Sequence, residues 1–327
     1  MYIYQIMSNN FGYIDIIVLG MIAGFIILRL RSILGRKTGH DSKVYPNFDL
    51  FLRTKISPLI LNLKPDADLN NVEELRAQIE PLFEAYRKMY AEYYTSCKHS
   101  NSPAIRDSNP VIILYPGVGL FSFSKDKQTA RVAAEFYTNA INVMRGAEAI
   151  SEYTSLPRQE AFNIEYWLLE EAKLQRMPKP KSLSGKIALV TGSAGGIGKA
   201  ISRKFAEEGA VVVLNDLDQD RLAAAGAQFL KEFGRDSYAT VQLNVTEDAG
   251  IKNAFSQAAL NFGGIDIVVN CAGLSISKPI EEHTDKDWDL LYDVLVKGQF
   301  KITQEAVSVL RKQKRGGDIL NIVSKNA

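Results

Sequence analysis

The sequence is poor in the residues that build metal centres and disulfide frameworks. Its 327 residues include two cysteines, Cys97 and Cys271, and three histidines, His40, His99 and His283. Two cysteines cannot form a disulfide framework, and a reducing compartment suits them. The histidines lie far apart and show no metal-ligand spacing. We therefore expect no metal site within this chain.

An excess of charge of one sign is also lacking. The 39 Lys and Arg residues nearly balance the 37 Asp and Glu residues, which leaves a net charge of +2. No global basic field favours nucleic acid as a partner. The 46% of hydrophobic residues is typical of a globular protein with a sizeable core. The length suffices for two ordinary domains.

One long uncharged run stands near the N-terminus. Residues 16–28, "IIVLGMIAGFIIL", follow Asp15 and precede four cations, Arg29, Arg31, Arg36 and Lys37. A membrane-spanning helix needs about 20 residues, and residues 11–14 extend the run. We expect an inner-membrane anchor with the bulk of the chain in the cytoplasm, because the cations follow the run. A buried core helix of a cytoplasmic protein is the alternative. A signal peptide is disfavoured, since no cation precedes the run and no small-x-small cleavage site follows it.

The middle of the chain predicts helices and one strand. Helical spacing of apolar residues covers residues 70–94, and residues 125–150 and 158–176 read as two further helices. Residues 111–115 read as a buried strand that ends at a Pro-Gly turn. The segment "MPKPKSLSG", residues 177–185, is a linker. We therefore divide the chain into residues 1–48, 49–178 and 179–327.

The last part alternates strands with helices, which predicts an α/β fold. Expected strands cover residues 186–190, 211–215, 238–245, 265–273 and 318–324, with a helix in each interval. Right-handed crossovers between such strands give a Rossmann-type, doubly wound parallel sheet. The fifth strand has no following partner in this sequence, and an open edge favours oligomerisation or aggregation.

The segment "TGSAGGIG" joins the first of these strands to its helix. Gly192 permits a tight turn, Gly196 lets the backbone approach a pyrophosphate, and Gly198 allows close packing of helix and strand. Phosphates would rest at the helix N-terminus. Asp216 follows Gly192 by 24 residues, at the end of the second strand, where a carboxylate accepts ribose hydroxyls and repels a 2′-phosphate. The pattern predicts a dinucleotide site and favours NAD over NADP as its cofactor. The alternative is an ordinary glycine turn and a solvated aspartate that bind no cofactor.

The TGxxxGIG spacing resembles the short-chain dehydrogenase/reductase family. "NCAG", Asn270 to Gly273, is similar to that family's NNAG motif, and Asn244 stands where an aspartate is usual. Ser324 matches the serine that holds the substrate carbonyl. The resemblance implies that the cofactor contacts come from Thr191, Gly192, Ser193, Gly196, Ile197, Gly198, Asp216, Asn244, Val245, Asn270, Ala272 and Gly273.

Two features depart from that family. Leu295 stands where the family has an asparagine in a proton relay. The family's Tyr-x-x-x-Lys motif does not occur after Ser324, and Lys325 does not follow a tyrosine at the required spacing. A tyrosine needs that lysine because its free pKa of about 10 makes it a poor base at neutral pH. We expect a sequence truncated within its active site, which binds cofactor but has negligible turnover.

Two further resemblances together cover almost the whole chain. Residues 50–327 resemble bifunctional proteins that join a class II aldolase to a short-chain dehydrogenase, of the rhamnulose-1-phosphate aldolase/lactaldehyde dehydrogenase type. Residues 1–48 resemble the N-terminal anchor of bacterial relatives of the mitochondrial import-motor anchor subunit. These resemblances imply an NAD-dependent oxidoreductase of a small hydroxy or aldehyde substrate. We also expect a homo-oligomer. The alternatives are a non-catalytic, membrane-tethered dinucleotide-binding module and, least favoured, an aldolase.

Overall fold

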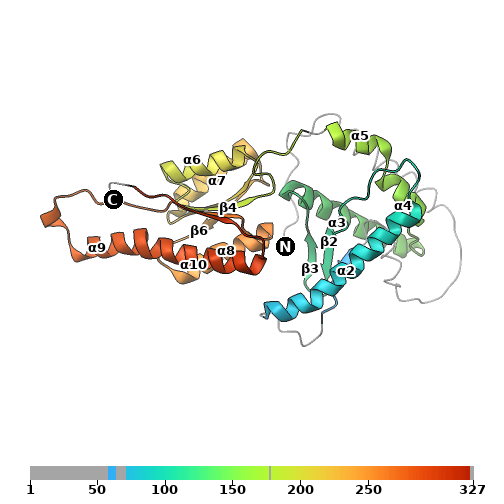
Figure 1. Ribbon diagram of the computed structural model, residues 1–327, viewed down its shortest axis with the longest axis horizontal. Helices are drawn as coiled ribbons and strands as arrows, with labels where there is room; N and C mark the ends of the chain where they lie inside the picture. Colours follow the sequence, from blue (N-terminus) through green and yellow to red (C-terminus); the bar gives the residue numbers. More distant parts are fainter. Residues whose placement is uncertain (1–57, 64–70, 177, 325–327) are drawn as a thin grey trace.

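The chain folds into two modules, each with its own sheet (Figure 1). The computed structural model describes residues 58–63, 71–176 and 178–324. We call the described residues from 58 to 176 the N-terminal module and residues 186–324 the C-terminal module. The predicted anchor, residues 16–28, lies outside the described residues. Within the described ranges, no helix has the length and apolar character needed to cross a membrane.

The N-terminal module contains a three-stranded sheet in the order β1-β2-β3. Its strands are β1 (Leu59–Ile60), β2 (Ile112–Tyr115) and β3 (Gly119–Ser122). β3 was not predicted, since four residues after a turn carry too short a pattern. Gly117, with φ of 78°, lies in the turn that lets β3 fold back antiparallel to β2.

The module also contains four helices: α2 (Val72–Cys97), α3 (Lys127–Ile150), α4 (Arg158–Glu165) and α5 (Leu168–Arg176). The helices α2 and α3 contact the sheet, whereas α4 packs on α2. The prediction of a single helix over residues 158–176 is wrong, because the helix ends at Glu165 and a second helix begins at Leu168. Phe162 and Tyr166 are both buried, and they pack with Tyr90 and Tyr93 of α2. The residue after Tyr166, Trp167, is 49% exposed. Packing of Phe162 and Tyr166 on α2 therefore overrides the continuous helical pattern.

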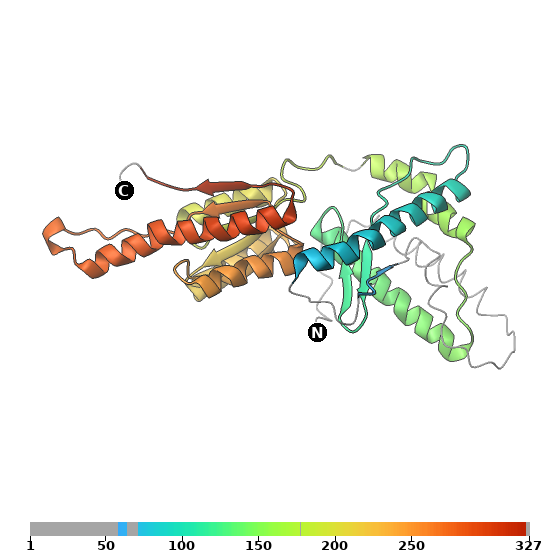
Figure 2. The same ribbon diagram turned by 60° about the horizontal axis from the view of Figure 1, so that its bottom comes forward.

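The C-terminal module is a five-stranded parallel sheet in the order β6-β5-β4-β7-β8, which confirms the predicted Rossmann-type fold (Figure 2). Its strands are β4 (Ile187–Thr191), β5 (Val211–Asp216), β6 (Tyr238–Gln242), β7 (Ile267–Asn270) and β8 (Asp318–Asn321). Among the described strands, β8 pairs with β7 alone. The order of the strands reverses between β4 and β7, and ligands of such sheets bind at that switch point.

Four helices cover the two faces of this sheet: α6 (Gly196–Glu207), α7 (Gln219–Phe233), α8 (Asp248–Phe262) and α10 (Gln299–Gln313). A further helix, α9 (Asp285–Tyr292), lies before α10 and has no buried residue. Alternate residues of each strand point to opposite faces. On one face, Leu189 and Val268 pack with α8 and α10; on the other, Val190 and Leu214 pack with α6 and α7. The central strands β4, β5 and β7 are therefore buried on both sides, as their continuous apolar sequences predict.

The long helix predicted over residues 285–312 is interrupted. A π-helical segment, Asp293–Gly298, separates α9 from α10. Gly298 lies inside the fold, and a Cβ there would stand 2.9 Å from the Val245 side chain. Such π-helical turns occur frequently at functional sites. A 3-10 turn at Ile280–Glu282 precedes α9.

Candidate functional site

The residues predicted to hold a dinucleotide follow the carboxyl ends of three adjacent strands. The glycine turn follows β4, Asp216 ends β5, and Asn270 ends β7. Because β4 lies between β5 and β7, the parallel fold brings these three segments to one edge of the sheet. That edge includes the switch point of the strand order.

The glycine turn between β4 and α6 has a conformation that depends on its glycines. Gly192 has φ of +67°, and a Cβ on it would lie 2.9 Å from the Cα atom of Ala272. A Cβ on Gly198 would lie 2.2 Å from the carbonyl oxygen of Gly192. At Gly196, by contrast, a Cβ would meet no atom within 4 Å. Gly192 and Gly198 therefore serve close packing, whereas Gly196 borders open space.

The N-terminus of α6 opens onto this same space. Its N-cap residue is Gly195, and no side chain caps the first turn. The exposed N–H groups and the helix dipole favour an anion there. Ser193, which is buried, donates both its backbone N–H and its hydroxyl to the carbonyl oxygen of Asn215, at 2.8 and 3.2 Å. This pair fastens the turn to the end of β5.

Asp216 lies beside the glycine turn. Its Oδ2 atom accepts a hydrogen bond from the backbone N–H of Ala194 at 3.0 Å, and its Oδ1 atom accepts one from Asp218 at 3.2 Å. Each carboxylate oxygen can accept a second hydrogen bond. The carboxylate is thus oriented by the backbone and keeps acceptor capacity for the hydroxyl groups of a ligand.

Thr191 joins the ends of β4 and β7. Its hydroxyl accepts hydrogen bonds from the backbone N–H groups of Cys271 and Ala272, both at 3.0 Å, and donates to the carbonyl oxygen of Val269 at 3.3 Å. The side chain is 1% exposed. Thr191 therefore shapes the turn around Ala272 and Gly273 from beneath.

Asn270 connects the same turn to two more elements. Its Nδ2 atom donates to the Thr303 hydroxyl of α10 at 3.1 Å and to Asn321 Oδ1 of β8 at 2.7 Å. Its Oδ1 atom is buried and has no hydrogen-bond partner among the described residues. Asn270 thus holds β7, β8 and α10 together rather than facing solvent.

The remaining predicted residues lie around this edge in different surroundings. Asn244, beyond the end of β6, accepts hydrogen bonds from both the N–H and the hydroxyl of Thr246, so it orders its own turn. Val245 is buried, whereas Ile197 is 63% exposed. Ser324 lies in the exposed segment that follows β8.

Three residues near the site were not assigned to it from the sequence. The Arg221 Nη2 atom lies 3.4 Å from the carbonyl oxygen of Ala194, which brings a cation to the glycine turn. Leu295 borders Gly273, since a Cβ built on Gly273 would lie 3.3 Å from the Cδ2 atom of Leu295. Burial raises the pKa of the Cys271 thiol, so this cysteine stays neutral. The one signal for Arg221 was its place in the first turn of a predicted helix after Asp216.

No group of side chains suited to a metal ion occurs in the described parts of the chain. The predicted absence of a metal site concerns the whole sequence, including residues beyond these parts. It therefore stays a prediction.

Comparison with known proteins places these features in a family. Residues 186–327 match the profile of the short chain dehydrogenase family, and residues 46–174 match the second domain of class II aldolases. An uncharacterized oxidoreductase, YuxG of Bacillus subtilis, is 36% identical over 279 residues, which cover 85% of this chain and 40% of that protein. The 3-oxoacyl-[acyl-carrier-protein] reductase FabG of Thermotoga maritima is 37% identical over 143 residues, 43% of this chain and 56% of that protein.

The chain thus spans about half, or less, of the length of these curated relatives. A solved short-chain type dehydrogenase/reductase from Mycobacterium marinum is 30% identical, with a TM-score of 0.42, over 43% of this chain and 57% of that one. For residues 186–327, the similarity in sequence is consistent with the parallel sheet and the glycine turn described above. The C-terminal part of the chain, residues 186–327, matches the short chain dehydrogenase family.

Proposed function

We propose that the C-terminal part of this chain binds NAD as part of an oxidoreductase that acts on a small hydroxy or aldehyde compound, such as a lactaldehyde-like sugar fragment. The observation that carries the proposal is the position of Asp216. Its carboxylate is held by Ala194 of the glycine turn. A ribose bound there would meet a hydrogen-bond acceptor, and a 2′-phosphate would meet a negative charge.

The residues present suit such a cofactor. The open space at Gly196 and the uncapped start of α6 fit a pyrophosphate, and Asp216 fits the adenine ribose. Thr191, Ser193 and Asn270 hold the walls of the site, while Ile197, Asn244, Val245, Ala272 and Gly273 complete the proposed contact set. When bound, a nicotinamide dinucleotide supplies the capacity to take up or release a hydride.

The same proposal covers the substrate side. Ser324 would orient the substrate oxygen by a hydrogen bond. Leu295 beside Gly273 carries no group that could move a proton.

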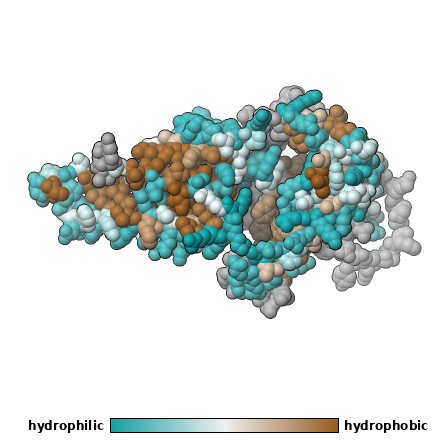
Figure 3. Space-filling model, viewed as in Figure 1, coloured by the Kyte–Doolittle hydropathy of each residue, from teal (hydrophilic) through white to brown (hydrophobic). Residues whose placement is uncertain are grey.

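The proposed arrangement of the whole chain comprises an anchor over residues 1–48, an aldolase-like part over residues 49–178 and the dehydrogenase part over residues 179–327. A membrane-tethered module that binds dinucleotide without catalysis is the alternative function, and it rests on the apolar sequence of residues 16–28. We also propose a homo-oligomer. Exposed apolar side chains support it: Trp288 and Phe300 near the π-helical segment, Leu320 in β8 and Val323 in the segment after β8. Figure 3 shows apolar surface on the same half of the molecule.

Calorimetric titration of the chain with NAD and NADP tests the cofactor proposal. We expect NAD to bind more tightly than NADP. Asp216→Ser should weaken NAD binding by about tenfold or more, because hydrogen bonds to a charged group contribute about 1.5–3 kcal/mol. Asp220→Ser, which removes the same charge from the first turn of α7, should leave NAD binding unchanged. A chain that is folded by circular dichroism but binds neither nucleotide would refute the proposal.

A further inference from the structure

The two modules meet at the amino-terminal ends of the C-terminal module's strands (Figure 1). Helices of a doubly wound sheet run antiparallel to the strands, so their C-termini gather at this edge. Two of these C-termini receive a cation from the N-terminal module. Lys127 Nζ of α3 donates to the carbonyl oxygen of Asn261 in α8 at 2.5 Å, and Arg76 Nη2 of α2 donates to that of Lys312 in α10 at 2.9 Å.

Lys127 supplies a positive charge at the C-terminus of α8. The last turn of α8 contains no basic residue of its own, although a helix C-terminus carries partial negative charge. The ammonium group of Lys127 also lies 5.3 Å from the centre of the Phe262 ring, within reach of a cation–π contact. The end of α8 is thus stabilised from the neighbouring module.

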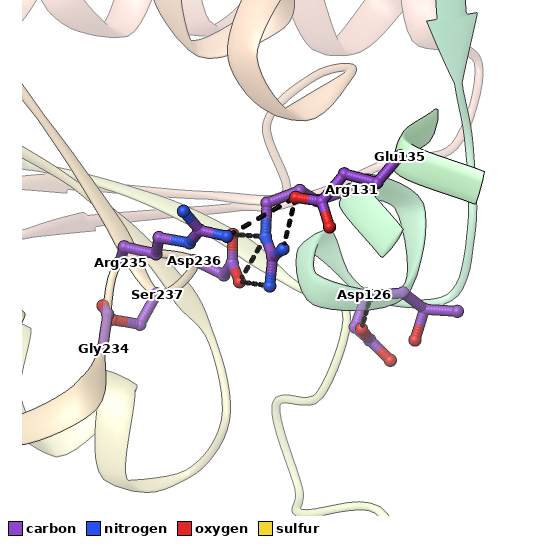
Figure 4. Close-up of polar contacts among 8 residues, drawn as sticks. Asp126, Arg131, Glu135, Gly234, Arg235, Asp236 and Ser237 are labelled. Atoms are coloured by element: carbon purple, nitrogen blue, oxygen red, sulfur yellow. Dashed lines mark hydrogen bonds and ion pairs between the residues drawn. The ribbon is translucent and has the colours of Figure 1, made fainter. Parts of the chain in front are cut away.

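A network of four charges lies next to this contact (Figure 4). Arg131 Nε of α3 lies 3.0 Å from both carboxylate oxygens of Asp236, in the loop before β6. Glu135 contacts Arg131 at 2.8 Å and Arg235 at 3.5 Å, so the charges alternate across the interface. The Arg131 and Asp236 side chains are only 23% and 19% exposed, which limits screening by solvent.

The tether between the modules is short. The Leu183 N–H donates to the carbonyl oxygen of Glu208 at 2.9 Å, and the Ser182 hydroxyl donates to the Glu208 carboxylate at 2.8 Å. The linker is thus fastened to the C-terminal module from Ser182 onward, and α5 ends at Arg176. A tether of this length gives an effective concentration in the millimolar range, so a few polar contacts are enough to hold the modules together.

We propose that Arg76, Lys127 and Arg131 form a cationic docking surface for the helix C-termini and Asp236 of the C-terminal module. This surface fixes the two modules in one orientation. The opposite, carboxyl edge of the sheet, with the glycine turn and Asp216, stays open. The docking does not depend on any bound nucleotide, and its test needs none.

Limited trypsin digestion of the full chain tests the proposal, with cleavage after Lys181 as the readout. The linker is exposed, but docking fixes both of its ends and resists the extension that a protease site requires, so we expect Arg131→Asp and Asp236→Arg each to raise the initial cleavage rate at least fivefold. The double variant should return to within twofold of the unmodified chain, because the ion pair re-forms with its charges exchanged. Raising the salt concentration from 50 to 500 mM should likewise accelerate cleavage of the unmodified chain.

Arg203→Glu serves as the matched control, since Arg203 pairs with Glu232 at 3.1 Å within the C-terminal module. Its cleavage rate should stay unchanged. Lys127→Met and Asp236→Asn keep the bulk of the side chains, so they report on docking if a charge reversal fails to fold; each should accelerate cleavage at least twofold. Folded variants that are cleaved at the unmodified rate, or a double variant no slower than the single ones, would overturn the proposal.

Discussion

The hydroxyl of Thr191 accepts a hydrogen bond from the backbone N–H of Ala272 at 3.0 Å. The two residues are 81 positions apart in the sequence and lie after neighbouring parallel strands. This contact joins the glycine turn of the proposed nucleotide site to the turn that we propose faces the nicotinamide end. A buried hydroxyl with both its donor and acceptor functions used fixes the separation of the two turns.

Thr191→Val should destabilise the C-terminal module. Valine keeps the shape but leaves the N–H groups of Cys271 and Ala272 without their acceptor, and an unpaired donor costs about 1–3 kcal/mol. We expect the lower end of that range, because both residues are half-buried. Chemical denaturation followed by circular dichroism measures the change. Thr191→Ser keeps the hydroxyl and should lose less than half as much; an equal loss would show that the hydroxyl is not the cause.

Substitutions of two glycines in the same turn should separate folding from binding. Gly198→Ala should lower the melting temperature strongly, since its methyl group would lie 2.2 Å from the carbonyl oxygen of Gly192. Gly196→Ala should leave the melting temperature nearly unchanged, because its methyl group enters open space. It should nevertheless weaken NAD binding if the pyrophosphate approaches there. Thermal melts with calorimetric titration decide this, and full NAD affinity in Gly196→Ala would contradict the assigned position of the pyrophosphate.

The N-terminal module should lose stability in alkali. Burial, and secondly the charge of Glu165, raises the pKa of Tyr86 to about 12. An unfolded tyrosine ionises near pH 10. Between pH 10 and 12 the unfolded chain therefore binds fewer protons than the folded chain, and the free energy of unfolding falls as pH rises. Urea melts at pH 9, 10.5 and 11.5 measure this, and Tyr86→Phe should show a smaller fall. Ionisation of Tyr86 at pH 10 in the folded chain, seen by ultraviolet absorbance, would contradict it.

The start of α9 should depend on Asp287. Its carboxylate accepts from Lys278 Nζ and from the N–H and hydroxyl of Thr284, and these contacts hold its pKa well below the usual range. Asp287→Asn should lower the melting temperature at pH 7. Because folding lowers the pKa of Asp287, its ionised carboxylate stabilises the folded chain at pH values above its pKa in the unfolded chain, about 3.9. This contribution is lost as the pH falls through the lower pKa of the folded chain. The difference from the unmodified chain should therefore shrink below about pH 4. Asp285→Asn, in the same turn, is the control, and an equal effect there would indicate a general charge effect.

Local sequence determined much of the C-terminal module. Apolar strands such as β5 alternate with amphipathic helices, and this pattern suffices to predict a parallel sheet. The place of Asp216 at the end of its strand follows from the same pattern. The N-terminal module was less predictable: β3 is too short to read, and the break at Tyr166 reflects packing on α2, which lies far away in the sequence. Pairing distant segments depends on contacts that no local pattern contains.

The sequence by itself determined the glycine turn, the strand that carries Asp216 and the order of strands and helices, because these follow from local backbone preferences and the periodicity of apolar residues. The tertiary structure alone decided that Thr191 holds Ala272 and that Asn270 joins Thr303 to Asn321. It alone brought Lys127 to the end of α8 and Arg131 to Asp236. The physical reason is that hydrogen bonds and ion pairs act over a few ångströms, and only the folded chain brings residues so far apart in sequence within that range.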